Sequence, residues 1–263
     1  MGENQSVLTI AAGLGPAAKE ETWITASDFS RSTTAHMLRD LKLALEPLRH
    51  AGIQRMLDIG CGFGGIARFV GMHLGVNDIH GLDRDLSVLA EARAKGVAAE
   101  LADLAAEPLP HSDGAFDLVT SFGMLDYFAD FDVVIQEMQR VLRAGGYAMV
   151  SLPNLAGWQN RIALLLGYQP RDVEVSQKFV VGVHPHYRAR KPSPVGHIHT
   201  ATTTAFWELM ERHGFETLWV TGAQPVPQGC GWLVARLDGI LSRSASLARR
   251  FFYLGRKRPE ESA

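Results

Sequence analysis

A carboxylate followed by closely spaced glycines is the part of this sequence best suited to bind a small molecule. The segment runs from Asp58 to Gly65 and reads DIGCGFGG. Glycines at a turn from strand to helix tolerate positive φ and let a ligand lie against the backbone. The spacing of Gly60, Gly62 and Gly65 fits the dinucleotide pattern G-x-G-x-x-G. A carboxylate two residues before the first glycine, however, suits a cationic ammonium group better than a pyrophosphate.

Two further acids follow the glycine segment in order. Asp83 ends an apolar stretch 19 residues after Gly64, and Asp103 stands shortly after the next one. A carboxylate at Asp83 can accept hydrogen bonds from both ribose hydroxyls of a nucleoside, whichever cofactor is bound. Taken alone, Asp83 could instead cap a helix beginning near Leu86, and Asp103 could be a turn residue. Their order along the chain favours a nucleoside-binding site.

The acids are positioned by segments that alternate between strand and helix character. Short apolar runs predict strands, and apolar residues spaced three or four apart predict helices. We expect strands at 54–59, 78–82, 97–101, 116–121, 147–152, 215–221 and 250–255. We expect helices at 30–50, 65–74, 86–95, 131–142, 154–166, 203–213 and 231–242. This alternation predicts βαβ units and therefore an α/β fold around a parallel sheet.

The stretch at 58–64 resembles the first motif of the class I S-adenosylmethionine-dependent methyltransferases. Residues 103–110 resemble that family's D-x-x-x-L-P stretch, and 142–146 its L-x-P-G-G turn, with Ala144 in place of proline. The resemblance extends over roughly residues 35–259. It implies a Rossmann-like, seven-stranded, mostly parallel sheet with helices on both faces and an antiparallel C-terminal strand.

The resemblance also implies how the chain is organised. We expect one methyltransferase domain over 1–263, without a linker that would separate two domains. The cofactor-binding half would be covered by a lid made of an N-terminal helix near 20–35 and the long insertion at 154–200. The expected parts are a loosely ordered 1–22, a cofactor-binding half at 30–152, a lid and acceptor region at 153–200, and a sheet completion at 201–263.

The implied cofactor is S-adenosylmethionine, and its product is S-adenosylhomocysteine. In the family, the acid matching Asp103 contacts the adenine amino group and the next residue packs nearby. The residues that the resemblance assigns to cofactor binding are Asp58, Gly60, Cys61, Gly62, Gly64, Asp83, Arg84, Asp103, Leu104, Ser121 and Phe122.

Methyl transfer from a sulfonium is a direct displacement, so a general base is needed only when the acceptor must lose a proton. Small-molecule members of the family often have Leu-Glu-His where this chain has Leu125-Asp126-Tyr127. Asp126 and Tyr127 are therefore candidates for lining the acceptor site, with packing as the alternative. Among the histidines, His197 and His199 are the candidate bases, being poised near neutral pH.

Histidines also raise the question of a metal. Two H-x-H pairs, His184 with His186 and His197 with His199, could ligate zinc or iron. Neither H-E-x-x-H nor C-x-x-C occurs, so we expect no metal, and a plain polar loop remains the alternative for these four residues.

The composition of the chain limits which partners it could bind and in which compartment it could work. Lys and Arg number 26 against 28 Asp and Glu, a net charge of −2, which argues against nucleic acid as a partner. Two cysteines suit a reducing compartment, and no apolar run is long enough for a membrane helix. We expect a cytoplasmic protein that acts on a small molecule and does not bind a membrane, with a homodimer left open.

Three other functions remain open at this stage. A nicotinamide-dependent oxidoreductase could use the same glycine loop, but Asp58 and Asp103 would then be unexplained. A family member could keep the cofactor without methylating anything, and the departure at 125–127 permits that. The third alternative is methylation of a macromolecule such as RNA, which the near-neutral net charge does not favour.

Overall fold

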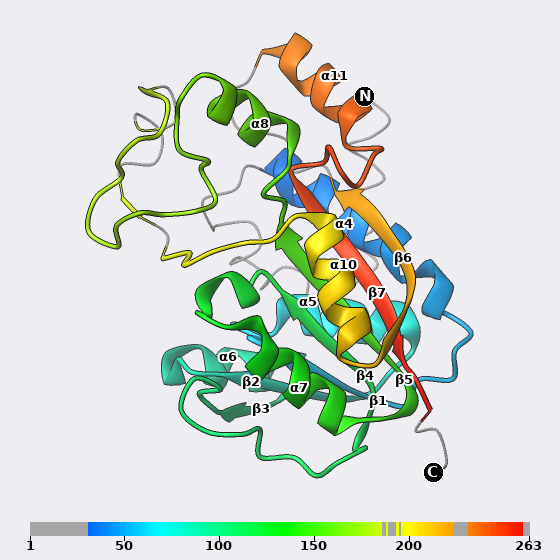
Figure 1. Ribbon diagram of the computed structural model, residues 1–263. Coiled ribbons are helices and arrows are strands. Elements are labelled where there is room, and N and C mark those ends of the chain that lie inside the picture. The colour runs from blue at the N-terminus through cyan, green and yellow to red at the C-terminus, as the bar shows by residue number, and fades with distance from the viewer. Residues whose placement is uncertain (1–30, 186–187, 189–192, 195, 224–230, 260–263) are drawn as a thin grey trace.

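The computed structural model describes residues 31–185, 188, 193–194, 196–223 and 231–259. Seven strands form one sheet in the order β3-β2-β1-β4-β5-β7-β6, with helices on both faces (Figure 1). The strands are β1 (Arg55–Ile59), β2 (Asp78–Asp83), β3 (Ala98–Leu101), β4 (Phe116–Phe122), β5 (Leu142–Pro153), β6 (Phe215–Ala223) and β7 (Arg250–Lys257). All seven predicted strands are present.

The sheet is parallel except for its last strand along the chain. β1 pairs in parallel with β2 and β4, and β4 with β5, whereas β7 pairs antiparallel with both β5 and β6. The predicted fold class, including the antiparallel C-terminal strand, is confirmed. The chain leaves β1 toward β2 on one side and later returns to β4 on the other. The carboxyl ends of β1 and β4 therefore form the switch point where open α/β sheets bind their ligands.

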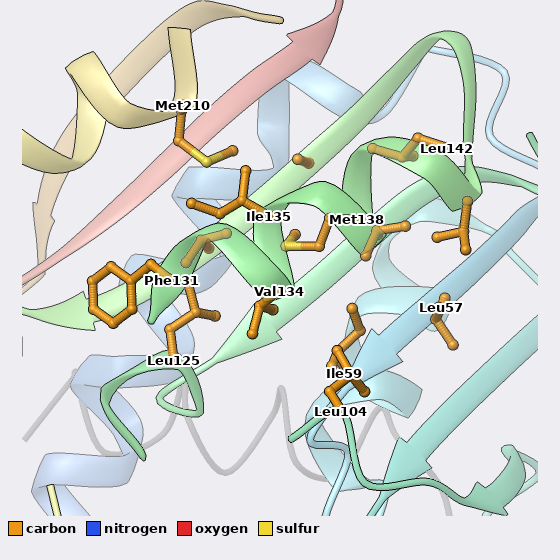
Figure 2. Packing of buried hydrophobic residues seen from close by; sticks show 14 of the residues in the cluster. Leu57, Ile59, Leu104, Leu125, Phe131, Val134, Ile135, Met138, Leu142 and Met210 are labelled. Atoms are coloured by element: carbon orange, nitrogen blue, oxygen red, sulfur yellow. The ribbon is translucent and has the colours of Figure 1, made fainter. Parts of the chain in front are cut away.

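The described helices are α4 (Arg31–Leu45), α5 (Gly65–Leu74), α6 (Leu86–Ala94), α7 (Phe131–Val141), α8 (Trp158–Leu165), α10 (Thr203–Arg212) and α11 (Trp232–Leu241), with short 3-10 helices η1 (Glu46–Leu48) and η2 (Leu125–Tyr127). Five of the α-helices contribute to two hydrophobic clusters, one on each face of the sheet. α4, α5 and α6 bury their apolar residues in one cluster, and α7 and α10 in the other. Figure 2 shows the second cluster, where Val134 and Met138 of α7 lie over the sheet.

The predicted helix at 154–166 begins later, at Trp158, because the residues before it close a loop. The side-chain amide of Asn154 is buried and donates to the carbonyls of Ala245, Ser246 and Ala248 at 2.9–3.2 Å. Asn154 also forms a parallel bridge with Ala201. The insertion at 154–200 is thus tied at its base, at the edge of the sheet where β5 ends (Figure 1).

Part of the expected lid, residues 20–30, lies outside the described residues, as does the expected loosely ordered 1–22. No helix in the described part of the chain combines the length and the apolar character needed to cross a membrane.

Candidate functional site

The glycine loop between β1 and α5 has the backbone conformation that its sequence predicts. Gly60, Gly62 and Gly64 have φ of 78°, 51° and 78°, a region that residues with a Cβ rarely adopt. The N–H groups of Gly60 and Cys61 both donate to the carbonyl of Leu82, at 2.8 and 2.9 Å. These bonds fix the loop to the end of the neighbouring strand β2.

Gly64→Ala is expected to lower the free energy of unfolding by about 2–4 kcal/mol, because backbone strain and overpacking add. A Cβ at Gly64 would lie 2.9 Å from Cα of Ala92 and 3.2 Å from Cγ2 of Val97. Gly52→Ala is the matched control: its φ is 68°, but a Cβ there would meet nothing within 4 Å. It should cost only about 1–2 kcal/mol. Equal losses in urea denaturation would show that the contact with α6 is not what requires glycine.

Asp83 ends β2 with its carboxylate already oriented by two backbone groups. The N–H of Gly62 donates to Oδ2 at 2.8 Å, and the N–H of Asp85 donates to Oδ1 at 2.9 Å. Helix α6 is capped by Asp85, whose carboxylate accepts from the N–H of Ser87, so Asp83 is not the cap. A Cβ on Gly62 would meet no atom within 4 Å. The loop beside the Asp83 carboxylate is therefore open to a ligand.

Asp58 is a buried carboxyl on β1, 2% exposed. The hydroxyl of Thr120 donates to its Oδ1 at 2.7 Å. Burial raises the pKa of Asp58 to about 7; the bond from Thr120 opposes the rise, and the charge of Asp83 adds to it. No lysine or arginine among the described residues forms an ion pair with this carboxyl. The ionised form therefore lacks a counter-charge, which a ligand ammonium group would supply.

Asp103 and Leu104 follow β3 at the same edge of the sheet. The Asp103 carboxylate is partly exposed and accepts from the N–H of Ala105 at 3.0 Å. The Leu104 side chain is buried in the core near Ile59 (Figure 2). Asp103 is thus free to face a ligand, whereas the side chain of Leu104 supports the segment from below.

The other residues assigned to cofactor binding differ in how far their side chains are exposed at the site. The Cys61 side chain is buried, and a Cβ on Gly81 would lie 2.7 Å from its Sγ, so this thiol is packed inside. Burial raises its pKa. Ser121 and Phe122 end β4 at the switch point, and the buried Ser121 hydroxyl has no hydrogen-bond partner among the described residues. Arg84 is exposed.

The structure brings Asp126 and His197 together, although they are far apart in sequence. Asp126 lies in η2 and is fully buried, and Nε2 of His197 lies 3.0 Å from its Oδ2. The N–H of Ile198 donates to the Asp126 carbonyl at 2.8 Å. The Tyr127 and His197 rings meet edge to face with centroids 5.1 Å apart. Burial and the charge of Asp126 raise the pKa of Tyr127, so its hydroxyl stays protonated at neutral pH.

The second candidate base has a different environment. The His199 ring stacks on Phe131 with centroids 4.4 Å apart, and its buried Nε2 has no hydrogen-bond partner among the described residues. In the other H-x-H pair, His184 with His186, His186 lies outside the described residues. Within the described residues, the one group of three side chains spaced to hold a metal is His80, Glu100 and His111. It contains no member of the two H-x-H pairs.

Two residues at this edge were not singled out by the sequence patterns. Thr120 holds Asp58, and Arg250 at the start of β7 donates to the Ser151 hydroxyl at 3.1 Å. A Cβ on Gly123 would lie 3.2 Å from Nη1 of Arg250, so this cation stands beside the turn after β4. Alternation on β4 could have indicated Thr120, which is two residues from the strand end. No local pattern could have indicated Arg250.

A cavity of about 700 Å³ lies elsewhere, lined by residues of α4, β6 and α11 such as Asp40, Thr221 and Arg236. None of the residues of the glycine loop lines it. We place the site at the carboxyl ends of β1, β2 and β4 because the positive-φ glycines, the oriented Asp83 and the buried Asp58 meet there.

Comparison with known proteins finds relatives of this chain. Residues 57–150 match the family described as "Methyltransferase domain". The ubiquinone biosynthesis O-methyltransferase of Cupriavidus pinatubonensis is 31% identical over 185 residues, which cover 68% of this chain and 70% of that protein. The Arabidopsis thaliana protein "Probable methyltransferase PMT6" is 28% identical over 109 residues, or 40% of this chain. That match covers only 18% of the plant protein's length.

A solved structure extends the similarity to the whole fold. The SAM-dependent methyltransferase of Thermotoga maritima aligns with a TM-score of 0.56 and 17% identity, covering 91% of this chain and 95% of its own. The predicted family is confirmed by the Cupriavidus relative and by the matched domain, which contains Asp58, Asp83 and Asp103. This chain belongs to the class I S-adenosylmethionine-dependent methyltransferases.

Proposed function

We propose that this protein transfers a methyl group from S-adenosylmethionine to a small organic acceptor. The observation that carries the proposal is the set of acids around the open glycine loop. Asp83 is oriented beside Gly62 and Asp103 is partly exposed. Asp58 is a buried carboxyl without a counter-charge. This set matches a ligand with a ribose, an amino-bearing base and an ammonium group.

The residues of the site fit the cofactor by their chemistry. In the proposal, Asp83 accepts from the ribose hydroxyls, Asp103 from the adenine amino group, and Asp58 faces the ammonium group. When bound, S-adenosylmethionine would supply an electrophilic methyl group for the acceptor lone pair, with S-adenosylhomocysteine as the leaving group. The chain itself contributes orientation and exclusion of water, which can account for much of the rate.

For the acceptor side, we propose that His197 removes the proton that the acceptor loses. The buried Asp126 carboxylate lies 3.0 Å from Nε2 of His197, close enough to orient the ring. Nδ1 is then the nitrogen left to take a proton. Tyr127, protonated at neutral pH, can donate a hydrogen bond to an acceptor oxygen, and the loop at 153–200 would cover this side.

The remaining expectations stay predictions from the sequence. They are a single domain, a cytoplasmic location, the absence of a nucleic acid or membrane partner, and a possible homodimer.

The test is a titration followed by an acceptor panel. Calorimetry with S-adenosylhomocysteine should show saturable one-to-one binding, and NAD(H) should show none. Transfer of labelled methyl from the cofactor is then measured on small acceptors. Hydroxyl compounds come first, since the Cupriavidus relative is named an O-methyltransferase. Pairs with and without a carboxylate should be included, because the positive charge of Arg250 acts on Tyr127, a proposed acceptor residue. Binding of NAD(H) alone would overturn the proposal in favour of an oxidoreductase, and cofactor binding without any transfer would favour a non-methylating member.

Cofactor affinity is expected to rise about tenfold between pH 6 and 7.5, because Asp58 must ionise to pair with the ammonium group and its pKa is raised to about 7. The same shift predicts that the ligand-free protein loses stability as pH rises from about 4 through 7, since its folded state holds a proton that the unfolded state releases earlier. Asp58→Asn should bind the cofactor weakly with no such pH dependence. A wild-type dissociation constant that is constant from pH 6 to 7.5 would refute the pairing with Asp58.

A further inference from the structure

Two histidines and a glutamate meet at the β2–β3 side of the sheet, away from the glycine loop. One potential ligand atom from each of His80, Glu100 and His111 lies within 4.8 Å of the other two. His80 is in β2 opposite Ala98 of β3, and Glu100 is two residues further along β3. Residues two apart on a strand share a face, so Glu100 lies on the face that carries His80. His111 comes from the segment that leads from β3 to β4.

Each histidine has one ring nitrogen that is buried without a hydrogen-bond partner among the described residues. These are Nδ1 of His80 and Nε2 of His111. A buried polar atom left unpaired costs about 1–3 kcal/mol, so two such atoms a short distance apart are unusual in a folded core.

The surrounding residues orient these rings as metal ligands are commonly oriented. Nε2 of His80 lies 2.9 Å from Oδ1 of Asp78, and Nε and Nη2 of Arg55, which can only donate, lie 3.3 and 3.1 Å from it. In the tautomer in which Nε2 donates to Asp78, Arg55 pairs with the Asp78 carboxylate instead, with Nε 3.2 Å from Oδ2, and the lone pair is left on Nδ1 of His80. That carboxylate–histidine arrangement supports many metal sites. Arg140 donates to the His111 carbonyl at 2.7 Å, which fixes the backbone of that ligand.

We propose that His80, Glu100 and His111 form a binding site for a divalent transition metal, with Zn²⁺ as the best-suited ion. Two imidazoles and one carboxylate match the nitrogen and oxygen ligands that zinc accepts at about 2.0–2.2 Å. The exposed side chain of Glu100 has the freedom to close the present spacing to that range. Three protein ligands leave a fourth position for water, and the bound ion would join the segment before β4 to strands β2 and β3.

The alternative is that the histidines only pack. Both rings meet Phe116 edge to face, with centroid distances of 5.4 Å for His80 and 5.0 Å for His111. Packing makes no use of the Glu100 carboxylate or of the two unpaired nitrogens. The two explanations therefore predict different effects of Glu100→Gln on Zn²⁺ affinity: a loss if the residues bind a metal, and no change if the histidines only pack. Glu100 is exposed, so this substitution leaves the fold intact.

The experiment titrates Zn²⁺ into the full, metal-free chain, without an affinity tag, by calorimetry. Wild type should bind one ion, and Glu100→Gln or His111→Gln should lose more than about 100-fold in affinity. Asp78→Asn should lose about 10- to 100-fold, the usual range for a residue that supports a ligand. His73→Gln is the matched control: this histidine also faces a carboxylate, with Nε2 3.5 Å from Glu46, but it lies outside the cluster. Its affinity should equal that of wild type.

A second measurement separates a built site from loose surface binding. Saturating Zn²⁺ should raise the melting temperature of wild type and of His73→Gln but not of Glu100→Gln, since only binding to the folded state stabilises it. Absence of one-to-one binding overturns the proposal, and so does equal affinity in wild type, Glu100→Gln and His111→Gln. Neither result bears on cofactor binding, which the same preparations can be tested for with S-adenosylhomocysteine.

Discussion

Replacing His197 by glutamine is expected to lower kcat for methyl transfer by about 10²- to 10⁴-fold, the usual contribution of a general base. The reason is the pair that His197 forms with the buried Asp126, with 3.0 Å between Nε2 and Oδ2. Glutamine keeps a polar side chain of similar reach but cannot take up a proton. The dissociation constant for S-adenosylhomocysteine should stay within about twofold, because His197 faces the acceptor in this proposal. Steady-state kinetics with any acceptor that is methylated measures kcat, and calorimetry measures the cofactor.

His213→Gln is the matched control for this substitution. His213 also pairs through Nε2 with an aspartate, Asp132, but it joins α10 to the start of α7, away from the glycine loop. Its loss should affect stability more than kcat. His199→Gln discriminates between the two candidate bases, because His199 stacks on Phe131 and has no carboxylate partner among the described residues. A larger loss of kcat in His199→Gln than in His197→Gln would contradict the assignment of the base.

Asp83→Ala is expected to weaken binding of S-adenosylhomocysteine by about 1–3 kcal/mol, roughly 5- to 150-fold, because two ribose hydroxyls lose their acceptor. The carboxylate also accepts from the N–H groups of Gly62 and Asp85. Its removal therefore frees the loop as well, which places the expected loss in the upper half of that range. Calorimetry of the variant against wild type at one pH gives the difference directly.

The neighbouring Asp85 supplies the control for that experiment. Asp85→Ala removes the cap of α6 and should cost about 1 kcal/mol of stability, but its carboxylate is engaged by Ser87 and not by the glycine loop. Cofactor affinity should therefore be unchanged. If Asp83→Ala bound the cofactor as tightly as wild type, the ribose would have to be placed elsewhere.

The sequence by itself determined the local parts of this protein. The strand ending at Asp58, the turn through Gly60 and Gly64, and the helix that follows are set by apolar periodicity and by glycine's tolerance of positive φ, which act over a few residues. For the same reason, α5 was predicted with the bounds that it has, Gly65–Leu74. Asp83 could be located because an acid at the end of the next strand must lie beside the turn.

The tertiary structure alone decided which distant residues meet. Asp126 contacts His197 because the insertion at 154–200 returns beside the end of β5, where Ala201 forms an isolated bridge with Asn154. No periodic pattern encodes where a loop of that length returns. The position of β7 between β5 and β6 places Arg250 beside Gly123 in the same way. The raised pKa of Asp58 depends on burial from all sides. Such effects sum over packing partners contributed by many segments, so they appear only once the chain has folded.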